Sequence, residues 1–152
     1  MRVVGVDVGT RRIGLAVSDP SGTLSRPLGV VTVAALDTTA VAAVRDRVRA
    51  LQAEDGPLAS LVVGLPRRLN GRPTEMTAHV EAFGRRLAEA CGLALHFQDE
   101  RLSSHEAEAM LAVREKDWRV RKRQLDAMSA AVILQDYLDT HAAAPAIDED
   151  PA

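Results

Sequence analysis

Three acidic residues, Asp7, Glu100 and Asp126, adjoin apolar segments in which burial of a charge is unfavourable. Asp7 lies inside the β-branched run Val3–Val8, where an ionised carboxylate costs several kcal/mol unless it is paired or bound to a cation. Three carboxylates brought together repel one another unless cations lie between them, and oxygen ligands of this kind suit Mg²⁺ or Mn²⁺. Such ions can activate water and stabilise the leaving oxygen of a phosphodiester. The residue types therefore point to metal-dependent phosphodiester hydrolysis.

Each acid also has a simpler structural interpretation. Asp7 could cap the turn that follows it, because Asp before Gly is a common turn signal. Asp99 and Glu100 could be solvated loop charges with Arg101 as a local partner. Adjacent residues of an extended chain point to opposite faces, so only one of this pair would face a site, and Asp99 ranks second to Glu100. Asp126 could be an acid favoured by the dipole of a nearby helix start. The metal-site hypothesis therefore depends on the three acids meeting at one edge of a sheet.

Basic residues cluster beside these acids. Such residues could bind phosphates and supply affinity without reading sequence, although the usual explanation of a charge run is a solvated surface. Trp118, within the most basic stretch, could cover a helix end or stack on an unpaired base. Three basic segments, each next to a proposed site element, favour nucleic-acid binding. The residues predicted to bind nucleic acid are Arg11, Arg12, Arg67, Arg68, Arg72, Arg101, Lys116, Trp118, Arg119, Arg121, Lys122 and Arg123.

The first third of the chain predicts an antiparallel meander. Apolar runs at Met1–Val8, Ile13–Ser18 and Arg26–Val33 are typical of strands, and Gly-Thr-Arg-Arg between the first two is a plausible hairpin turn. Asp37 then predicts the cap of a helix that closes at Gly56.

The rest of the chain predicts alternating strands and helices. Ser60–Val63 has the continuous apolar pattern of a central parallel strand, a helix follows up to Gly92, and Leu93–Phe97 predicts another strand. Ser103 with Glu106 has the spacing of a capping box, so a third helix is expected to start there. Arg114–Gln124 is predicted to be a loop or frayed helix end, and the last helix to run from about Leu125 to Leu138. The predicted fold is α/β, with helices packed on a mixed sheet.

Length and composition narrow the class of protein. At 152 residues the chain is expected to form one domain over residues 1–140, followed by a disordered acidic, Ala/Pro-rich tail over residues 141–152. The net charge of -2 argues against a generally basic nucleic-acid binder, and the single cysteine excludes an internal disulfide framework. Because no long apolar segment or signal peptide is visible, we expect a cytoplasmic protein, monomeric or homodimeric, that binds no membrane.

Four segments in fixed order carry a family resemblance: Val6-Asp7-Val8-Gly9-Thr10 with Arg12-Ile13-Gly14-Leu15-Ala16, Val63-Gly64-Leu65-Pro66 with Asn70-Gly71, Asp99-Glu100-Arg101-Leu102-Ser103, and Leu125-Asp126 with Ala130-Ala131-Val132-Ile133-Leu134. They resemble the YqgF/RuvX family of pre-16S rRNA nucleases and Holliday junction resolvase-like proteins. The resemblance implies an RNase H-like fold, trimming of precursor ribosomal RNA, and Asp7, Glu100 and Asp126 as the catalytic and metal-binding acids. Related resolvases are expected to use four carboxylates. A fourth is not evident here, because Asp136 lies a helix face away from Asp126.

Several functions remain in competition. The leading hypothesis is a metal-dependent nuclease that processes precursor ribosomal RNA and could also cut single-stranded DNA. A Holliday junction resolvase and a non-catalytic RNA-binding ribosome-assembly factor are the alternatives. A fragment related to actin-like sugar kinases would share the motif at Asp7–Thr10, but the chain is too short for their second lobe.

Overall fold

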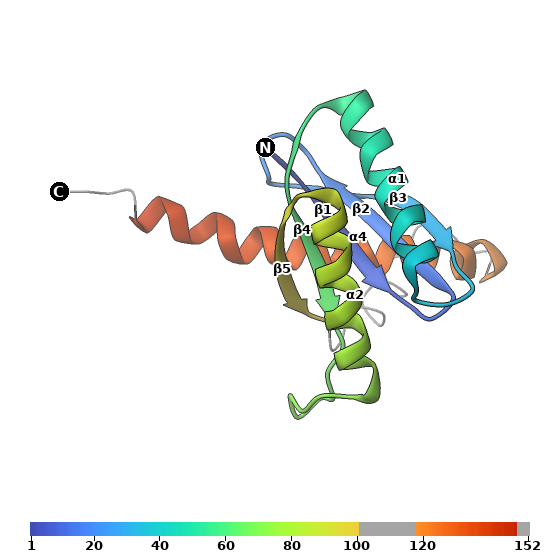
Figure 1. Ribbon diagram of the computed structural model, residues 1–152. Coiled ribbons are helices and arrows are strands. Elements are labelled where there is room, and N and C mark those ends of the chain that lie inside the picture. The colour runs from blue at the N-terminus through green and yellow to red at the C-terminus, as the bar shows by residue number, and fades with distance from the viewer. Residues whose placement is uncertain (101–117, 149–152) are drawn as a thin grey trace.

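The computed structural model describes residues 1–100 and 118–148, with side chains described for residues 1–100 and 125–141. The strands are β1 (Arg2–Val8), β2 (Arg12–Ser18), β3 (Ser25–Thr32), β4 (Leu58–Leu65) and β5 (Ala94–Asp99). The helices are α1 (Thr38–Asp55), α2 (Glu75–Cys91) and α4 (Trp118–Asp148). They form a five-stranded sheet in the order β3-β2-β1-β4-β5, with α1 and α2 on one face and α4 across the other (Figure 1).

The sheet combines the two predicted halves. β1, β2 and β3 form the antiparallel meander, and β4 and β5 run parallel to β1. The first turn is closed by the Gly9 N–H, which donates to the Arg12 carbonyl at 2.9 Å. The ends of β1, β4 and β5 and the start of β2 therefore lie at the same edge of the sheet. This edge is where the predicted acids must meet.

Alternation along β1 separates two hydrophobic cores. Val4, Val6 and Val8 pack with α1 and α2, whereas Val3 packs with α4 on the opposite face. Because side chains alternate along a strand, Asp7 shares the α4 face with Val3 and Gly5.

The ends of α1 and α2 follow the predicted signals. The Asp37 side chain accepts from the Ala40 N–H at 3.0 Å at the start of α1, which ends at Gly56. Gly92 ends α2 with a left-handed φ of 67°. β4 is longer than the predicted Ser60–Val63, and the other strand ends differ from prediction by one or two residues, as fraying element ends commonly do.

α4 differs most from the prediction. It begins at Trp118, so of the two predicted alternatives the loop is wrong for residues 118–124, which form the first turns of the helix. Arg, Lys and Gln are good helix formers, and a run of their charges does not break a helix. Asp126 consequently lies about two turns inside α4 rather than in its first turn, and the helix-dipole explanation fails.

At its other end, α4 continues to Asp148, where the sequence predicts a disordered tail from residue 141. Ala142, Ala143 and Ala144 favour helix strongly, which the acidic composition of the tail obscures. The capping box at Ser103 and Glu106 falls outside the described residues. Among residues 1–100 and 118–148, the helices include none with the length and apolar character needed to cross a membrane.

Candidate active site

The three predicted acids come from three elements. Asp7 is near the end of β1, Glu100 directly follows β5, and Asp126 is on α4. A hydrogen bond joins the side chains of Asp7 and Glu100, and the charge of Asp126 repels that of Asp7. The Glu100 N–H donates to the Leu65 carbonyl at 3.3 Å, which fixes the chain after β5 against the end of β4. The structure therefore brings the predicted acids to one edge, with Asp7 in the middle.

Gly64 lets Glu100 reach Asp7 across the intervening strand β4. A Cβ added at Gly64 would lie 2.6 Å from Glu100 Oε2 and 2.5 Å from Ile133 Cδ1. Only a residue without a side chain leaves space for both groups. Gly14 has the same function beside Asp7: it pairs with Asp7 in the sheet, and a Cβ there would collide with the Asp126 main chain.

The sequence alone does not reveal that Gly14 and Gly64 make room for the acids, although both glycines occur in the family motifs. The available signal was a small residue inside a β-branched strand, which often marks close approach of another backbone or ligand. The identity of the approaching groups, Asp126 and Glu100, becomes known only from the structure.

Burial distinguishes the two adjacent acids at the end of β5. The Glu100 side chain is half-buried, whereas Asp99 is exposed. The charge of Asp99 still acts on Glu100 and raises its pKa. This arrangement supports the ranking of Glu100 above Asp99.

The Asp7–Glu100 pair holds a proton at neutral pH. Burial raises the pKa of Asp7 to about 6, an effect opposed by the hydrogen bond from Glu100 and increased by the charge of Asp126. Burial raises the pKa of Glu100 to about 9, with further contributions from the charge and hydrogen bond of Asp7 and the charge of Asp99. Glu100 is therefore the protonated partner and donates to the Asp7 carboxylate. The pair would have to give up this proton to hold a cation.

One carboxylate oxygen of Asp126, Oδ2, is buried and lacks a hydrogen-bond donor among the described residues. Its Oδ2 lies 3.0 Å from Arg12 Nε, close enough for an ion pair. The two groups are not aligned for a hydrogen bond, and Oδ2 accepts none from any group within the described part of the chain. A buried acceptor left in this way is destabilising by about 1–3 kcal/mol. Arg12 thus offsets the charge of Asp126 without satisfying its lone pairs.

The donor set fits a hard divalent cation. All three groups offer carboxylate oxygens, the ligands preferred by Mg²⁺ and Mn²⁺. Among the described residues, no three His, Cys, Asp or Glu side chains are already gathered into a metal cage. Mg²⁺ commonly binds through one or two carboxylates with water and phosphate oxygens completing its shell. An open set of donors around Asp7, with the unsatisfied Oδ2 of Asp126, is compatible with that mode.

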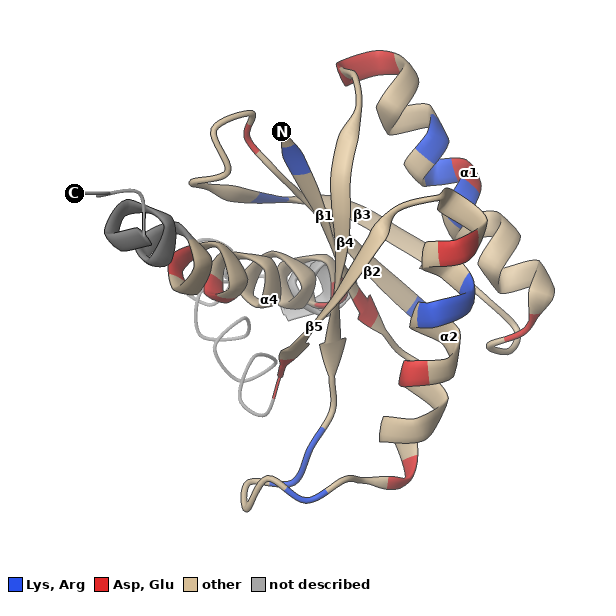
Figure 2. Cartoon of the chain, turned by 60° about the vertical axis from the view of Figure 1, so that its left-hand side comes forward, with Lys and Arg blue, Asp and Glu red and all other residues tan. Residues whose placement is uncertain are grey.

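The predicted nucleic-acid-binding residues have different surroundings. Arg12 pairs with Asp126, whereas Arg11 is exposed beside it. The loop over residues 66–73 extends its basic segments beyond the end of β4 (Figure 2), with Arg68 and Arg72 exposed and Arg67 bonded within the loop. Arg101 and Lys116 fall outside the described residues. The structure assigns Trp118, Arg119, Arg121, Lys122 and Arg123 to the helical start of α4 without describing their side chains.

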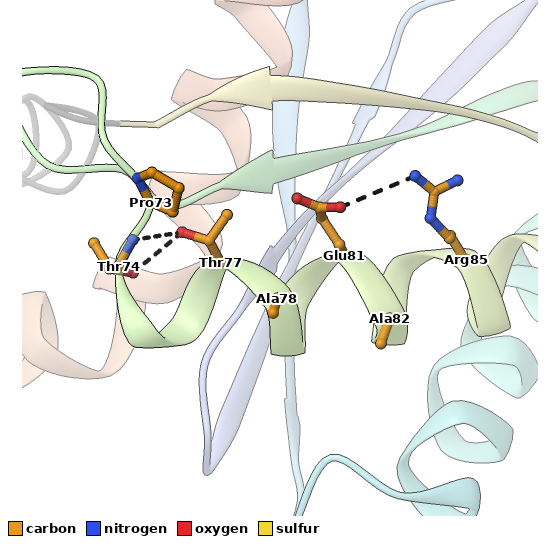
Figure 3. A pocket seen from close by; sticks show the side chains of 7 residues that line it. All are labelled: Pro73, Thr74, Thr77, Ala78, Glu81, Ala82 and Arg85. Carbon is orange, nitrogen blue, oxygen red and sulfur yellow. Dashed lines mark hydrogen bonds and ion pairs between the residues drawn. The ribbon is translucent and has the colours of Figure 1, made fainter.

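A groove of about 460 Å³ follows α2 from Pro73 to Arg85 (Figure 3). Glu81 and Arg85 form an ion pair of 4.0 Å along it. None of the three candidate acids lines this groove. It is therefore separate from the group of carboxylates.

The five-stranded mixed sheet, crossed on one face by α4, has an RNase H-like fold. The fold resembles that of RuvC from Thermus thermophilus in complex with a Holliday junction substrate, with a TM-score of 0.52, 19% identity, and coverage of 93% of this chain and 96% of that chain. The predicted fold class is confirmed.

The chain belongs to the RuvX family, described as Holliday junction resolvase, whose model matches residues 1–140. A relative from Moorella thermoacetica is 40% identical over 140 residues, covering 91% of this chain and 95% of the relative. A second, from Clavibacter michiganensis subsp. michiganensis, is 42% identical over 141 residues, covering 93% and 84%. Both carry the name pre-16S rRNA nuclease. The family predicted from the four motifs is confirmed.

Proposed function

We propose that this chain is a metal-dependent nuclease that hydrolyses phosphodiester bonds in precursor ribosomal RNA, with Asp7, Glu100 and Asp126 as its metal-binding acids. The names of its relatives support this substrate. The observation that carries the proposal is the hydrogen-bonded Asp7–Glu100 pair, which holds a proton where two ionised carboxylates would repel each other. An uptake of cations would replace that proton and relieve the repulsion from Asp126.

The acids and the arginines of the candidate site have separate functions in this proposal. Bound Mg²⁺ or Mn²⁺ would supply an activated water and stabilise the leaving oxygen. Asp7, Glu100 and Asp126 would hold the ions, and Asp7 is central among the three acids. Glu100 would have to give up its proton to solvent before it could act as a ligand. Arg68 and Arg72 lie at the same edge and contact phosphates of the RNA.

The test uses labelled precursor ribosomal RNA, single-stranded DNA and a four-way DNA junction, each with Mg²⁺, Mn²⁺ or chelator. Asp7→Asn keeps the shape of the side chain and removes its charge, so we expect cleavage to fall by orders of magnitude. Asp46→Asn, an equal change at an exposed residue of α1, should cleave like the wild type. Cleavage that survives in Asp7→Asn or in excess chelator would contradict the proposal.

Resolution of Holliday junctions is the second candidate because the matching family model carries that description. Asp136 does not complete a four-carboxylate site: it is exposed and lies about 15 Å along α4 from Asp126. The three acids around Asp7 therefore favour the ribosomal RNA substrate. Paired incisions in the four-way junction, faster than cleavage of RNA, would reverse this order.

A further inference from the structure

The loop between β4 and α2 carries Leu69 at its tip. Leu69 is 73% exposed, more than Met1 at 71% or Leu24 at 65% among the exposed large hydrophobic residues described. A single exposed apolar residue needs no functional explanation. Three further features bear on Leu69: the hydrogen bonds that hold its loop, the position of the loop, and the charged residues beside Leu69.

Main-chain and side-chain hydrogen bonds hold this loop. The Gly71 N–H donates to the Arg68 carbonyl and the Arg68 N–H donates to the Arg72 carbonyl, each at 2.8 Å. Asn70 Oδ1 accepts from the Arg72 N–H at 3.0 Å, and the Arg67 guanidinium donates to the Gly71 carbonyl at 3.2 Å. Gly71 supplies the left-handed φ of 85° that closes the turn.

The turn therefore depends on Asn70 and Gly71, both usual turn residues, and requires no apolar side chain at position 69.

The base of the loop is fixed beside the candidate active site. Thr77 Oγ1, in the first turn of α2, donates to the Pro66 carbonyl at 2.5 Å. The preceding residue, Leu65, accepts from the Glu100 N–H at 3.3 Å. Leu69 is thus four residues from the main-chain contact of a proposed metal ligand. The loop extends from the same sheet edge as the acids (Figure 2).

The charges beside Leu69 match a nucleic-acid strand. Arg68 and Arg72 are exposed on either side of the tip and can contact phosphates, while the apolar side chain between them matches the faces of bases. Proteins that deform nucleic acids often insert an apolar side chain such as Leu between neighbouring bases.

We propose that Leu69 is a wedge that enters between two adjacent bases of the bound strand, while Arg68 and Arg72 bind the flanking phosphates. The inference rests on the proposed nuclease function and makes the substrate class more specific. Unstacking is less unfavourable in single-stranded or frayed RNA than inside a continuous duplex. The enzyme therefore selects unpaired segments, and Leu69 is a specificity-determining residue rather than a catalytic one.

The test measures binding in chelator, so that no cleavage is required. Single-stranded RNA carrying 2-aminopurine becomes more fluorescent when that base loses its stacking, and saturating wild-type protein should raise the emission at one position of the strand. Leu69→Ala should abolish most of this rise and weaken binding about tenfold, because the apolar area inserted between bases is lost. Binding to a continuous RNA duplex should change less than twofold.

Two variants are controls. Leu24→Ala removes an equally large exposed side chain from the turn after β2, at the opposite end of the sheet, and should bind like the wild type. Arg68→Ala should flatten the dependence of binding on salt by about one unit of slope, whereas Leu69→Ala should leave the slope unchanged. All three variants should keep the wild-type melting temperature, since each changed side chain is exposed.

The outcomes separate this inference from the proposed function. A full fluorescence rise with Leu69→Ala, or an equal loss with Leu24→Ala, overturns the wedge. If the wild type also cleaves RNA with Mg²⁺ in that case, the nuclease proposal stands. A fluorescence rise that depends on Leu69, without cleavage in Mg²⁺ or Mn²⁺, supports the wedge and rejects the nuclease proposal.

Discussion

At the residue scale, the acids at the sheet edge are in a protonation state that cation binding must change. The shared proton of Asp7 and Glu100 removes one negative charge, and the guanidinium of Arg12 offsets that of Asp126. The metal-free protein thus neutralises its own acids. If these acids bind a cation as proposed, the cation would displace the proton, and Arg12 would have to move or share the Asp126 carboxylate.

The proton makes stability of the metal-free protein depend on pH. The pKa of Asp7 rises from 3.8 to about 6, and that of Glu100 from 4.5 to about 9, so the folded state binds more protons than the unfolded state between these values. The contribution of both groups is intact below their unfolded pKa values and is lost as pH rises through the folded ones. In chelator, Asp7→Asn should therefore gain melting temperature relative to wild type as pH rises from 5 to 9, by about 3 °C or more at the upper end. Parallel melting curves across that range would contradict the shared proton.

Arg12 should compete with the cation for Asp126. Its ion pair is partly exposed, and such pairs contribute about 0–1 kcal/mol, so Arg12→Ala should tighten Mn²⁺ binding by up to about fivefold. The same variant should weaken RNA binding, because a phosphate-binding cation is removed. Titration of free Mn²⁺ by electron paramagnetic resonance measures the first effect. The neighbouring exposed Arg11→Ala should weaken RNA binding without changing Mn²⁺ affinity, and an equal effect of both variants on Mn²⁺ would argue against competition.

At the element scale, the close approach of α4 to the sheet depends on glycines in three strands. A Cβ at Gly5 would lie 2.7 Å from Leu134 Cβ, and one at Gly14 or Gly64 would meet Asp126 or Glu100. The absence of these side chains lets one helix bury Ile133 against the sheet and also present Asp126 at its edge. Packing and site geometry are therefore coupled.

Gly64→Ala tests this coupling. The new methyl group would displace Glu100, Ile133 or both, so we expect a loss of about 1–3 kcal/mol in stability and a larger proportional loss of cleavage. Gly84→Ala is the control: its Cβ would lie 3.1 Å from Phe97 Cε1, on the other side of the sheet, away from the acids. Denaturant unfolding and cleavage rates are measured on both. Wild-type cleavage by a folded Gly64→Ala protein would show that Glu100 does not need its present position.

Sequence patterns predicted the strands, α1 and α2, because the periodicity, caps and turn residues of these elements are local signals. The same elements predicted the sheet edge at which the acids meet. Asp7 could be identified since a charge interrupts a β-branched strand. The start of α4 could not be located, because Arg and Lys at 119–123 suit both a solvated loop and a helix. The contacts of Arg12 with Asp126, and of Glu100 with Gly64, join residues far apart in the chain and arise only from the tertiary fold.

At the scale of the whole molecule, a net charge of -2 is compatible with nucleic-acid binding because the cations are unevenly placed. The loop after β4 carries basic residues at the end of the sheet that holds the acids, and α1 carries others over the sheet face opposite α4 (Figure 2). The first turns of α4 add Arg and Lys that precede Asp126 in the chain. Only those Lys and Arg side chains that reach phosphates displace the counterions bound to the nucleic acid. The position of each charge, rather than the total, should set the salt dependence of binding.

Two variants of equal net charge distinguish position from total. Replacing Arg121, Lys122 and Arg123 with Ala removes three cations before Asp126 on α4. Replacing Arg45, Arg47 and Arg49 removes three from α1. The α4 variant should bind RNA more weakly and lower the slope of log affinity against log salt by about one unit for each lost phosphate contact, with little change in cleavage at saturating RNA. The α1 variant should keep nearly the wild-type slope, because α1 packs on the sheet face opposite α4. Equal slopes in the two variants would mean that binding responds only to total charge, and the start of α4 would then be a solvated surface.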